Sequence, residues 1–259
     1  MTSSTAVVVT GGSSGLGAAA ARRFHDAGHV VHVFDYADAS EQEAGPYFYH
    51  QVDVRDDARV REAFNAVAGS GVALGGVVHC AGIASFGPNN PGHLVDVDNQ
   101  QVHDNFSTIE NTIQTNLIGS FSVVRHGGEL ISRRGLHPAE ENGFIIMTSS
   151  GAALEGKAGQ TAYSASKAAI IGMTLPLARE FSTLGIRVVT IAPGLFDTPI
   201  LNDTPKIERN VPFPHRIGDP DEFGKLALHI SENKYLNADV IRLDGGTRSE
   251  FVSTAPFVR

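Results

Sequence analysis

Residues 5–17 read TAVVVTGGSSGLG, and this stretch sets the architecture of the chain. Its first six residues are β-branched or small without polar alternation, which is typical of a strand buried on both faces. The glycines that follow allow a tight turn in which backbone N–H groups can approach a pyrophosphate. The alanine-rich residues 18–27 predict a helix that directs its positive end towards the same phosphates. The stretch therefore predicts the start of a dinucleotide-binding unit, with a plain strand-to-helix turn as the alternative.

The second apolar run ends in an acid, Asp35. A carboxylate at that point can accept both hydroxyls of an adenosine ribose and would repel a 2′-phosphate. Ser13, Ser14 and Tyr36 offer no basic side chain for such a phosphate. We therefore expect NAD rather than NADP, while a solvated acid at the end of a strand is the alternative role for Asp35.

Short β-branched runs alternate with helical patterns along the whole chain. Strands are predicted at 5–10, 30–34, 47–52, 76–80, 144–148, 186–191 and 240–243, and helices at 18–27, 58–68, 106–124, 161–181 and 222–232. This alternation implies right-handed crossovers. We expect one α/β domain over residues 1–259, a Rossmann-type doubly wound, mostly parallel seven-stranded sheet with helices on both faces.

Composition excludes several classes of protein. The net charge of −8 argues against nucleic acid as the main partner, because phosphate binding needs a basic surface. No apolar run approaches the roughly 20 residues of a membrane span, and the N-terminus has no signal-peptide pattern. Cys80 is the only cysteine, so no internal disulfide is possible. We expect a cytoplasmic protein without membrane contact or metal.

The clearest chemical signal is the stretch Tyr163-Ser164-Ala165-Ser166-Lys167. Residues four apart on a helix share a face, so the phenol and the ammonium are expected to lie together. A nearby ammonium lowers the pKa of a phenol, which then serves as general acid for ketone reduction and general base for alcohol oxidation. A purely structural tyrosine would leave Lys167 unexplained. A non-catalytic dinucleotide-binding scaffold is the remote alternative for the whole chain.

A serine hydroxyl can stabilise charge on the substrate oxygen, and two candidates precede the tyrosine. Ser149 and Ser150 both follow the strand predicted at 144–148. The spacing Thr-Gly-x-x-x-Gly-x-Gly from Thr10 resembles the nucleotide turn of the short-chain dehydrogenase/reductase family, and the spacing in that family favours Ser150. The resemblance further implies that Asn116 holds a water linking Lys167 to solvent; a helix-bending asparagine is the alternative.

The resemblance to this family covers essentially the whole chain. It includes the spacing Thr-Gly-x-x-x-Gly-x-Gly from Thr10, Asp53-Val54 after the third strand, and Pro193-Gly194 after the sixth. Cys80-Ala81-Gly82 stands where the family usually has Asn-Ala-Gly. The cofactor contacts that the glycine turn, Asp35 and the resemblance together predict are Gly11, Ser14, Gly15, Leu16, Gly17, Asp35, Asp53, Val54, Cys80, Ala81, Gly82, Tyr163, Lys167, Pro193, Gly194, Phe196 and Thr198. On residue type alone, Asp53 could equally be a neighbour of a helix N-cap.

The second half resembles a subgroup of the family that oxidises L-3-hydroxyacyl-CoA with NAD, above all over residues 158–201 and 240–246. A dehydrogenase of a small, cyclic or steroid secondary alcohol is the alternative. One departure is that residues 89–104 are acidic and polar, whereas the phosphates of CoA prefer Lys or Arg. Arg133 and Arg134 could supply that charge, although nothing in the sequence places them at the pocket mouth.

Two irregular, proline-containing stretches, 85–98 and 193–219, follow strands and are expected above the carboxyl ends of the sheet, where ligands bind. Ordinary surface loops are the alternative. Within the second, residues 195–216 are predicted to form a substrate lid. Its apolar residues are Phe196, Ile200, Leu201, Ile207, Val211 and Phe213. The resemblance also implies a homotetramer assembled through the helices at 106–124 and 161–181.

Overall fold

The computed structural model describes residues 5–38, 46–84, 93–96, 101–102, 105–135, 140–201 and 211–248. Its centre is a sheet of seven parallel strands in the order β3-β2-β1-β4-β7-β8-β9. These strands are β1 Ala6–Thr10, β2 Val30–Asp35, β3 Phe48–Gln51, β4 Leu74–His79, β7 Gly143–Thr148, β8 Ile186–Pro193 and β9 Val240–Leu243. The predicted doubly wound α/β fold is confirmed.

The order of the strands reverses between β1 and β4, because the chain runs outward from β1 to β3 and then returns to the other side. In register, Val9 of β1 pairs with Val33 of β2 and with Val78 of β4. The crevice outside the carboxyl ends of the two strands at such a switch point is where this architecture binds ligands.

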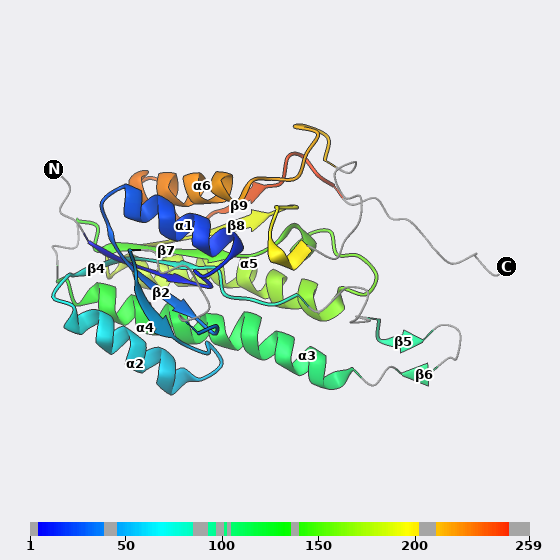
Figure 1. Ribbon diagram of the computed structural model, residues 1–259, viewed down its shortest axis with the longest axis horizontal. Coiled ribbons are helices and arrows are strands. Elements are labelled where there is room, and N and C mark those ends of the chain that lie inside the picture. The colour runs from blue at the N-terminus through cyan, green and yellow to red at the C-terminus, as the bar shows by residue number, and fades with distance from the viewer. Residues whose placement is uncertain are drawn as a thin grey trace.

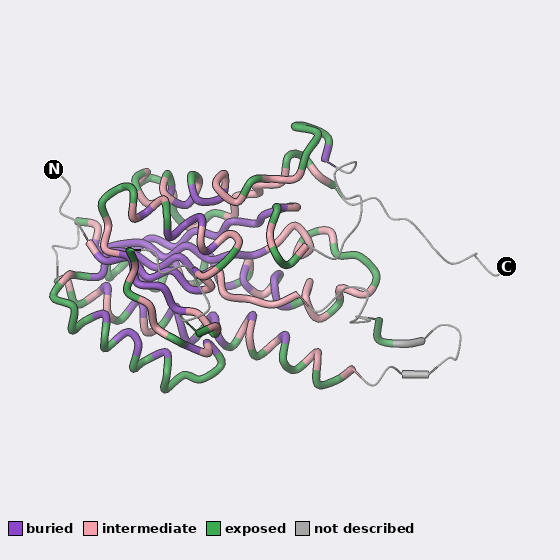
Figure 2. The backbone as a smooth tube through the Cα atoms, viewed as in Figure 1, coloured by how far each residue is buried: buried purple, intermediate pink, exposed green. Residues whose placement is uncertain are grey.

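Helices cover both faces of the sheet (Figure 1). α1 (Gly15–Asp26) and α6 (Pro220–Glu232) pack on one face, around the fully buried Phe24 and Phe223. α2 (Asp57–Gly69), α4 (Gly119–Ser132) and α5 (Thr161–Ser182) pack on the other. β1, β4, β7 and β8 are buried along their whole length, as the apolar runs predict, and Figure 2 shows them as the buried centre of the molecule.

Where one continuous helix was predicted at 106–124, the structure differs. The structure has α3 (Phe106–Ile113), a π-helical turn η2 (Gln114–Ile118) and then α4, which continues to Ser132. A π-turn inserts one residue per turn and shifts the backbone carbonyls out of the α-helical hydrogen-bond pattern. Residue periodicity cannot reveal such an insertion, and this one lies at Asn116.

The sequence did not predict a short antiparallel pair that begins in the first irregular stretch and ends beyond it, β5 (Val95–Asp96) with β6 (Gln101–Val102). Residues 85–92 of that stretch lie outside the described part, as do lid residues 202–210 with Ile207. Single-turn 3-10 helices follow β7 and β8, η3 at Gly151–Ala153 and η4 at Pro199–Leu201. In the described part of the chain, no helix is long and apolar enough to cross a membrane.

Candidate active site

The glycine turn after β1 is built so closely that side chains cannot replace its glycines. A Cβ on Gly17 would lie 2.0 Å from the carbonyl oxygen of Gly11, and one on Gly11 would lie 2.9 Å from the amide nitrogen of Ala81. Gly11 and Gly15 also adopt positive φ angles, 64° and 51°. α1 begins directly after the turn, with Ser14 at its N-cap and no acidic residue in its first turn. The resulting cradle of backbone at a helix N-terminus fits a dinucleotide pyrophosphate.

Asp35, the last residue of β2, is hydrogen-bonded to this turn. Its carboxylate accepts the backbone N–H of Ser13 at 3.0 Å through one oxygen and that of Ala37 at 3.1 Å through the other. A freely solvated acid, the alternative role, would make neither contact. Tyr49, which was not predicted from the sequence, contacts the same two segments. Its hydroxyl hydrogen-bonds the Ser13 hydroxyl at 3.0 Å and donates to the Ala37 carbonyl at 2.7 Å.

At the end of β3, Asp53 binds an arginine. Its carboxylate accepts a forked pair of hydrogen bonds from Arg55, the shortest 2.6 Å long, and these lower the pKa of Asp53. The helix N-cap is Asp56, whose side chain accepts the N–H groups of Ala58 and Arg59. Val54, predicted with Asp53 to contact the cofactor, is buried, and the contact between Asp53 and Arg55 was not predicted from the sequence.

The segment after β4 lies against the glycine turn. The Thr10 hydroxyl accepts the N–H groups of Cys80 at 3.2 Å and Ala81 at 3.0 Å. Burial raises the pKa of the Cys80 thiol to about 11, so this departure from the family's asparagine is a neutral thiol. Gly82 lies beside the catalytic candidates, because a Cβ there would be 3.2 Å from both Asn116 Oδ1 and Lys167 Nζ.

Asn116 lies in the π-turn and is buried. Its side chain accepts the N–H of Ile83 at 2.8 Å, donates to the Ile83 carbonyl at 2.9 Å and donates to the Ser166 hydroxyl at 3.1 Å. It therefore joins the segment after β4 to α5. Its backbone carbonyl accepts the Ser120 hydroxyl at 2.7 Å.

The two candidate serines after β7 have different environments. Ser149 is buried and donates its hydroxyl to the Lys167 carbonyl at 2.7 Å, so it stabilises the packing of α5 on the sheet. Ser150 caps η3 by accepting the Ala152 N–H at 3.1 Å, and its side chain also hydrogen-bonds Tyr163. Of the two, Ser150 is the serine that lies beside the phenol.

Tyr163 and Lys167 lie one turn apart on α5, with the ammonium nitrogen 5.9 Å from the centre of the phenol ring. The Lys167 ammonium donates to the Thr148 carbonyl at 3.0 Å, and burial lowers the pKa of Lys167 to about 8. The pKa of Tyr163 is raised by burial more than the Ser150 hydrogen bond lowers it. The lowered tyrosine pKa expected from the sequence is therefore absent from this structure, because desolvation outweighs the effect of the Ser150 hydrogen bond.

A buried histidine, also missed by the sequence analysis, connects the glycine turn to the π-turn. His79 hydrogen-bonds the Thr10 hydroxyl through Nδ1 at 2.7 Å and the Ser120 hydroxyl through Nε2 at 2.8 Å. The Thr10 hydroxyl oxygen already accepts two backbone N–H groups, so its own proton points to Nδ1 of His79. Nε2 of the neutral His79 ring therefore carries the hydrogen. Burial lowers the pKa of His79 to about 3, which keeps it neutral.

The segment after β8 also approaches the glycine turn. The nearest atoms to a Cβ on Gly15 would be those of Thr198, at 3.2 Å. Gly194 donates its N–H to Leu243 at 2.9 Å, and Phe196 is buried beside Gly218, with which it forms an isolated bridge. Pro193 ends β8, and Leu16 of α1 is packed against the same core. The predicted cofactor contacts thus converge on one edge of the sheet.

Arg133 and Arg134 lie far from this edge. They follow the C-terminus of α4, where Arg133 pairs with Glu129 at 2.6 Å and Arg134 donates to the carbonyl of Asn142, just before β7 begins. That is the amino end of the strands, whereas Ser150 follows their carboxyl end. The suggestion that these arginines bind CoA phosphates at the pocket mouth is wrong.

The sequence profile of the short chain dehydrogenase family matches residues 5–208. The chain belongs to the short-chain dehydrogenase family. The 3-hydroxyacyl-CoA dehydrogenase type-2 of Rattus norvegicus is 40% identical over 253 residues, covering 94% of this chain and 95% of that protein. The ipsdienol dehydrogenase of Ips pini is 36% identical, covering 93% and 96%. The crystal structure of 3-hydroxyacyl-CoA dehydrogenase type-2 from Mycobacterium avium has a TM-score of 0.84 at 34% identity, covering 95% and 96%.

Membership in the short-chain dehydrogenase family makes the protein an oxidoreductase that acts on CH–OH groups with a nicotinamide dinucleotide. The family resemblance drawn from the motifs is confirmed over nearly the full length. Within the described residues, no group of three His, Cys, Asp or Glu side chains could hold a metal ion.

Proposed function

We propose that the protein oxidises a 3-hydroxyacyl-CoA to the 3-ketoacyl-CoA with NAD, and catalyses the reverse reduction. The observation that carries the chemistry is the Ser150–Tyr163 hydrogen bond, with Lys167 one turn further along α5. These groups follow the carboxyl end of β7, on the edge of the sheet that also carries the glycine turn.

In the oxidation, the hydroxyl proton of the substrate passes to the Tyr163 oxygen, and the carbon–oxygen double bond forms as a hydride leaves the same carbon. The bound nicotinamide supplies the acceptor for that hydride. Ser150 hydrogen-bonds the substrate oxygen and stabilises the charge that develops there. Lys167 favours the phenolate by its positive charge, and Asn116 fixes α5 against the segment after β4. Reduction uses the same groups in reverse, with Tyr163 as the acid.

NAD is the proposed dinucleotide because the Asp35 carboxylate stands beside the glycine turn, where it would repel a 2′-phosphate. The residues proposed to hold NAD are those predicted from the sequence, with Tyr49 added behind Asp35. Wild-type kcat/KM should be higher for NAD than for NADP. Asp35→Ala should reduce that difference by weakening the binding of NAD. Equal kcat/KM for both cofactors in the wild type would contradict this assignment.

The acyl-CoA substrate is supported by the relatives named 3-hydroxyacyl-CoA dehydrogenase type-2 and by the apolar lid proposed over residues 195–216. Each methylene that the substrate buries adds at most about 0.8 kcal/mol of binding free energy, so an apolar wall can select chain length. An apolar wall does not by itself distinguish an acyl thioester from a cyclic alcohol. The second candidate is a secondary alcohol without CoA, which the likeness to ipsdienol dehydrogenase favours.

The experiment that separates the two candidates compares acetoacetyl-CoA with ketones of similar size that lack CoA, each reduced with NADH. The acyl-CoA proposal predicts at least tenfold higher kcat/KM for the CoA ester, which corresponds to about 1.4 kcal/mol of transition-state binding. A smaller ratio would show that the CoA group makes no useful contact, and the second candidate would replace the first.

We further propose a homotetramer in the cytoplasm. Support for assembly comes from exposed apolar side chains on two helices, Phe121 on α4 and Leu175 on α5. Along α5 the sequence also has a stripe of small and apolar residues, Ala162, Ala165, Ala169 and Met173. Of these, Ala165 is exposed, whereas Met173 is buried in its own subunit. A monomer by light scattering at micromolar concentration would contradict the assembly. The cytoplasmic location rests on the single cysteine, which cannot form an internal disulfide.

A further inference from the structure

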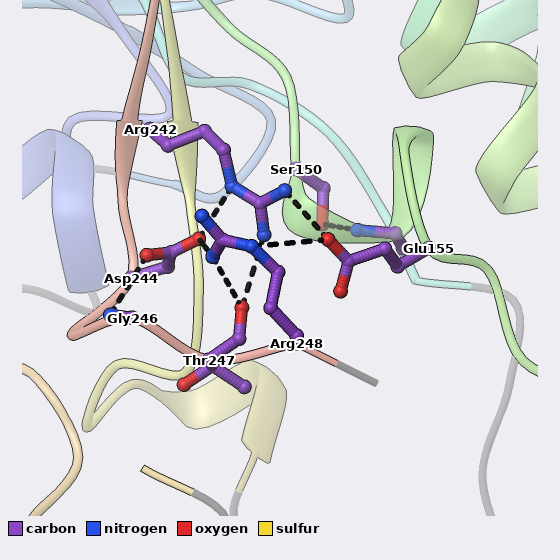
Figure 3. A network of polar contacts seen from close by, with 8 residues as sticks. Ser150, Glu155, Arg242, Asp244, Gly246, Thr247 and Arg248 are labelled. Carbon is purple, nitrogen blue, oxygen red and sulfur yellow. Dashed lines mark hydrogen bonds and ion pairs between the residues drawn. The ribbon is translucent and has the colours of Figure 1, made fainter. Parts of the chain in front are cut away.

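An ionic cluster at the carboxyl end of β9 reaches the loop that carries Ser150 (Figure 3). Ser150 opens η3, and Glu155 follows two residues after that turn ends. Glu155 accepts a hydrogen bond of 2.6 Å from Arg242 of β9, and Arg248 approaches the same oxygen at 3.6 Å. The loop and the strand are far apart in sequence, so this cluster is a long-range tie.

Arg242 is held on two other sides. Its Nε donates to Asp244 at 2.6 Å and its second terminal nitrogen donates to the Thr247 carbonyl at 3.0 Å. The Asp244 side chain is only 7% exposed and also accepts the N–H of Gly246 at 3.0 Å. Because the planar Arg242 guanidinium donates hydrogen bonds on three sides, its orientation is fixed. Glu155 therefore binds a donor that cannot turn away.

The turn that contains Asp244 is bound to two further segments of the site. Gly194, beside the nicotinamide-facing residues predicted after β8, would bring a Cβ within 2.7 Å of Asp244. On the other side, Phe213 of the lid donates its N–H to the Gly245 carbonyl at 3.3 Å, and Val211 packs against the same glycine. The serine loop, the segment after β8 and the end of the lid therefore meet at one ionic cluster.

The serine loop has little apolar anchorage of its own. None of residues 151–156 is buried, and the side chain of Leu154 is half exposed. We propose that Arg242 is a positioning residue for catalysis: through Glu155 it fixes the loop that places the Ser150 hydroxyl against Tyr163 and the substrate oxygen. The inference rests on the proposed function of Ser150.

The chain offers a matched control. Arg187, at the start of β8, pairs with Glu141 at 2.6 Å and donates to three backbone carbonyls, and its side chain is more deeply buried than that of Arg242. It lies at the amino ends of the strands, away from the serine. Arg187→Met and Arg242→Met should therefore both lower the melting temperature, whereas only Arg242→Met should impair catalysis.

The test measures kcat, substrate KM and NADH affinity for these variants. A displacement of about 1 Å can cost on the order of a hundredfold in rate, so we expect Arg242→Met to lower kcat by about 10- to 100-fold. NADH affinity should stay within about threefold. Glu155→Gln should lower kcat in the same direction and Arg242→Lys should restore part of it, and Glu155→Gln remains informative if Arg242→Met does not fold.

The decisive arm repeats Arg242→Met in a Ser150→Ala background. If Arg242 acts through the serine hydroxyl, the second change should cost less than about threefold in the residual kcat, because coupled residues are non-additive. An unchanged kcat in Arg242→Met and Glu155→Gln would overturn the inference, and so would full additivity of Arg242→Met with Ser150→Ala. In either case, activity of the wild type would leave the proposed function standing. A wild type inactive on every secondary alcohol and ketone would instead overturn the proposed function.

Discussion

At the scale of single residues, the site depends on how burial changes two protonation equilibria in opposite directions. Burial lowers the pKa of the Lys167 ammonium to about 8 and raises the pKa of the Tyr163 phenol. Tyr163 is therefore protonated at neutral pH, as the general acid for ketone reduction must be. Alcohol oxidation needs the phenolate, so its rate should rise with pH, while reduction should not rise.

Replacing Lys167 by methionine tests this balance. The substitution keeps most of the length of the side chain and removes the charge that favours the phenolate, so the tyrosine pKa should rise further. We expect kcat for oxidation at pH 7 to fall at least tenfold, with the ascending limb of its pH profile moved to higher pH. The measurement is kcat against pH in both directions. An oxidation profile that coincides with that of the wild type would remove the charge of Lys167 from the mechanism.

Residue identity predicted the chemical groups better than their surroundings. The Tyr163–Lys167 spacing and the glycines of the first turn were visible because a helix period and a glycine turn are local patterns. His79, Tyr49, Glu155 and Arg242 were not predicted, since each acquires its role from a partner more than 30 residues away. The sequence therefore indicated the reaction but not the contacts that hold its groups in place.

At the scale of elements, the predicted strands and helices agree closely with the structure, since buried parallel strands and amphipathic helices leave clear periodicities. The exceptions are the unpredicted β5–β6 pair, the continuation of α4 to Ser132 and two local changes of the backbone. The π-turn at Gln114–Ile118 contains Asn116, which is hydrogen-bonded to Ile83, and the short η3 turn after Ser150 precedes Glu155, which is bound by Arg242. No periodicity within the segment specifies them.

The glycine turn gives an element-scale prediction. In Gly17→Ala, the new methyl group would lie 2.0 Å from the Gly11 carbonyl oxygen, so the turn or the start of α1 must move. We expect KM for NAD to rise at least tenfold and the melting temperature to fall. Gly69→Ala is the control: Gly69 is the last residue of α2, and no atom lies within 4 Å of its added Cβ. It should leave KM unchanged and add up to about 1 kcal/mol to the free energy of unfolding. A normal KM for NAD in Gly17→Ala would contradict the assigned cradle.

At the scale of the whole molecule, two buried histidines should make folding sensitive to acid. Burial lowers the pKa of His32 to about 4 and that of His79 to about 3, whereas an unfolded histidine titrates near ~6.5. Below ~6.5 the unfolded chain binds protons that the native protein does not, so the free energy of unfolding falls as pH decreases. Each histidine contributes up to about 1.4 kcal/mol per pH unit.

Urea unfolding at pH 7 and pH 5 checks this prediction. Most carboxylates titrate below this window, near ~4, so the histidines dominate the change between these two pH values. We expect a clearly lower urea midpoint at pH 5, and His79→Asn should reduce the pH dependence. The midpoint of the wild type should not stay constant from pH 7 to pH 5; a constant value would mean that these rings are solvated or charged in the native protein.

The most direct test of the account is Tyr163→Phe, assayed for ketone reduction with NADH. The substitution keeps the ring in place and removes the only proton that the side chain can exchange. General acid–base catalysis is typically worth about 10²- to 10⁴-fold, so kcat should fall at least 100-fold while the Kd for NADH, followed by its fluorescence, stays within about threefold. A kcat within threefold of the wild type would contradict the assignment of Tyr163 as the proton carrier and, with it, the proposed chemistry of the site.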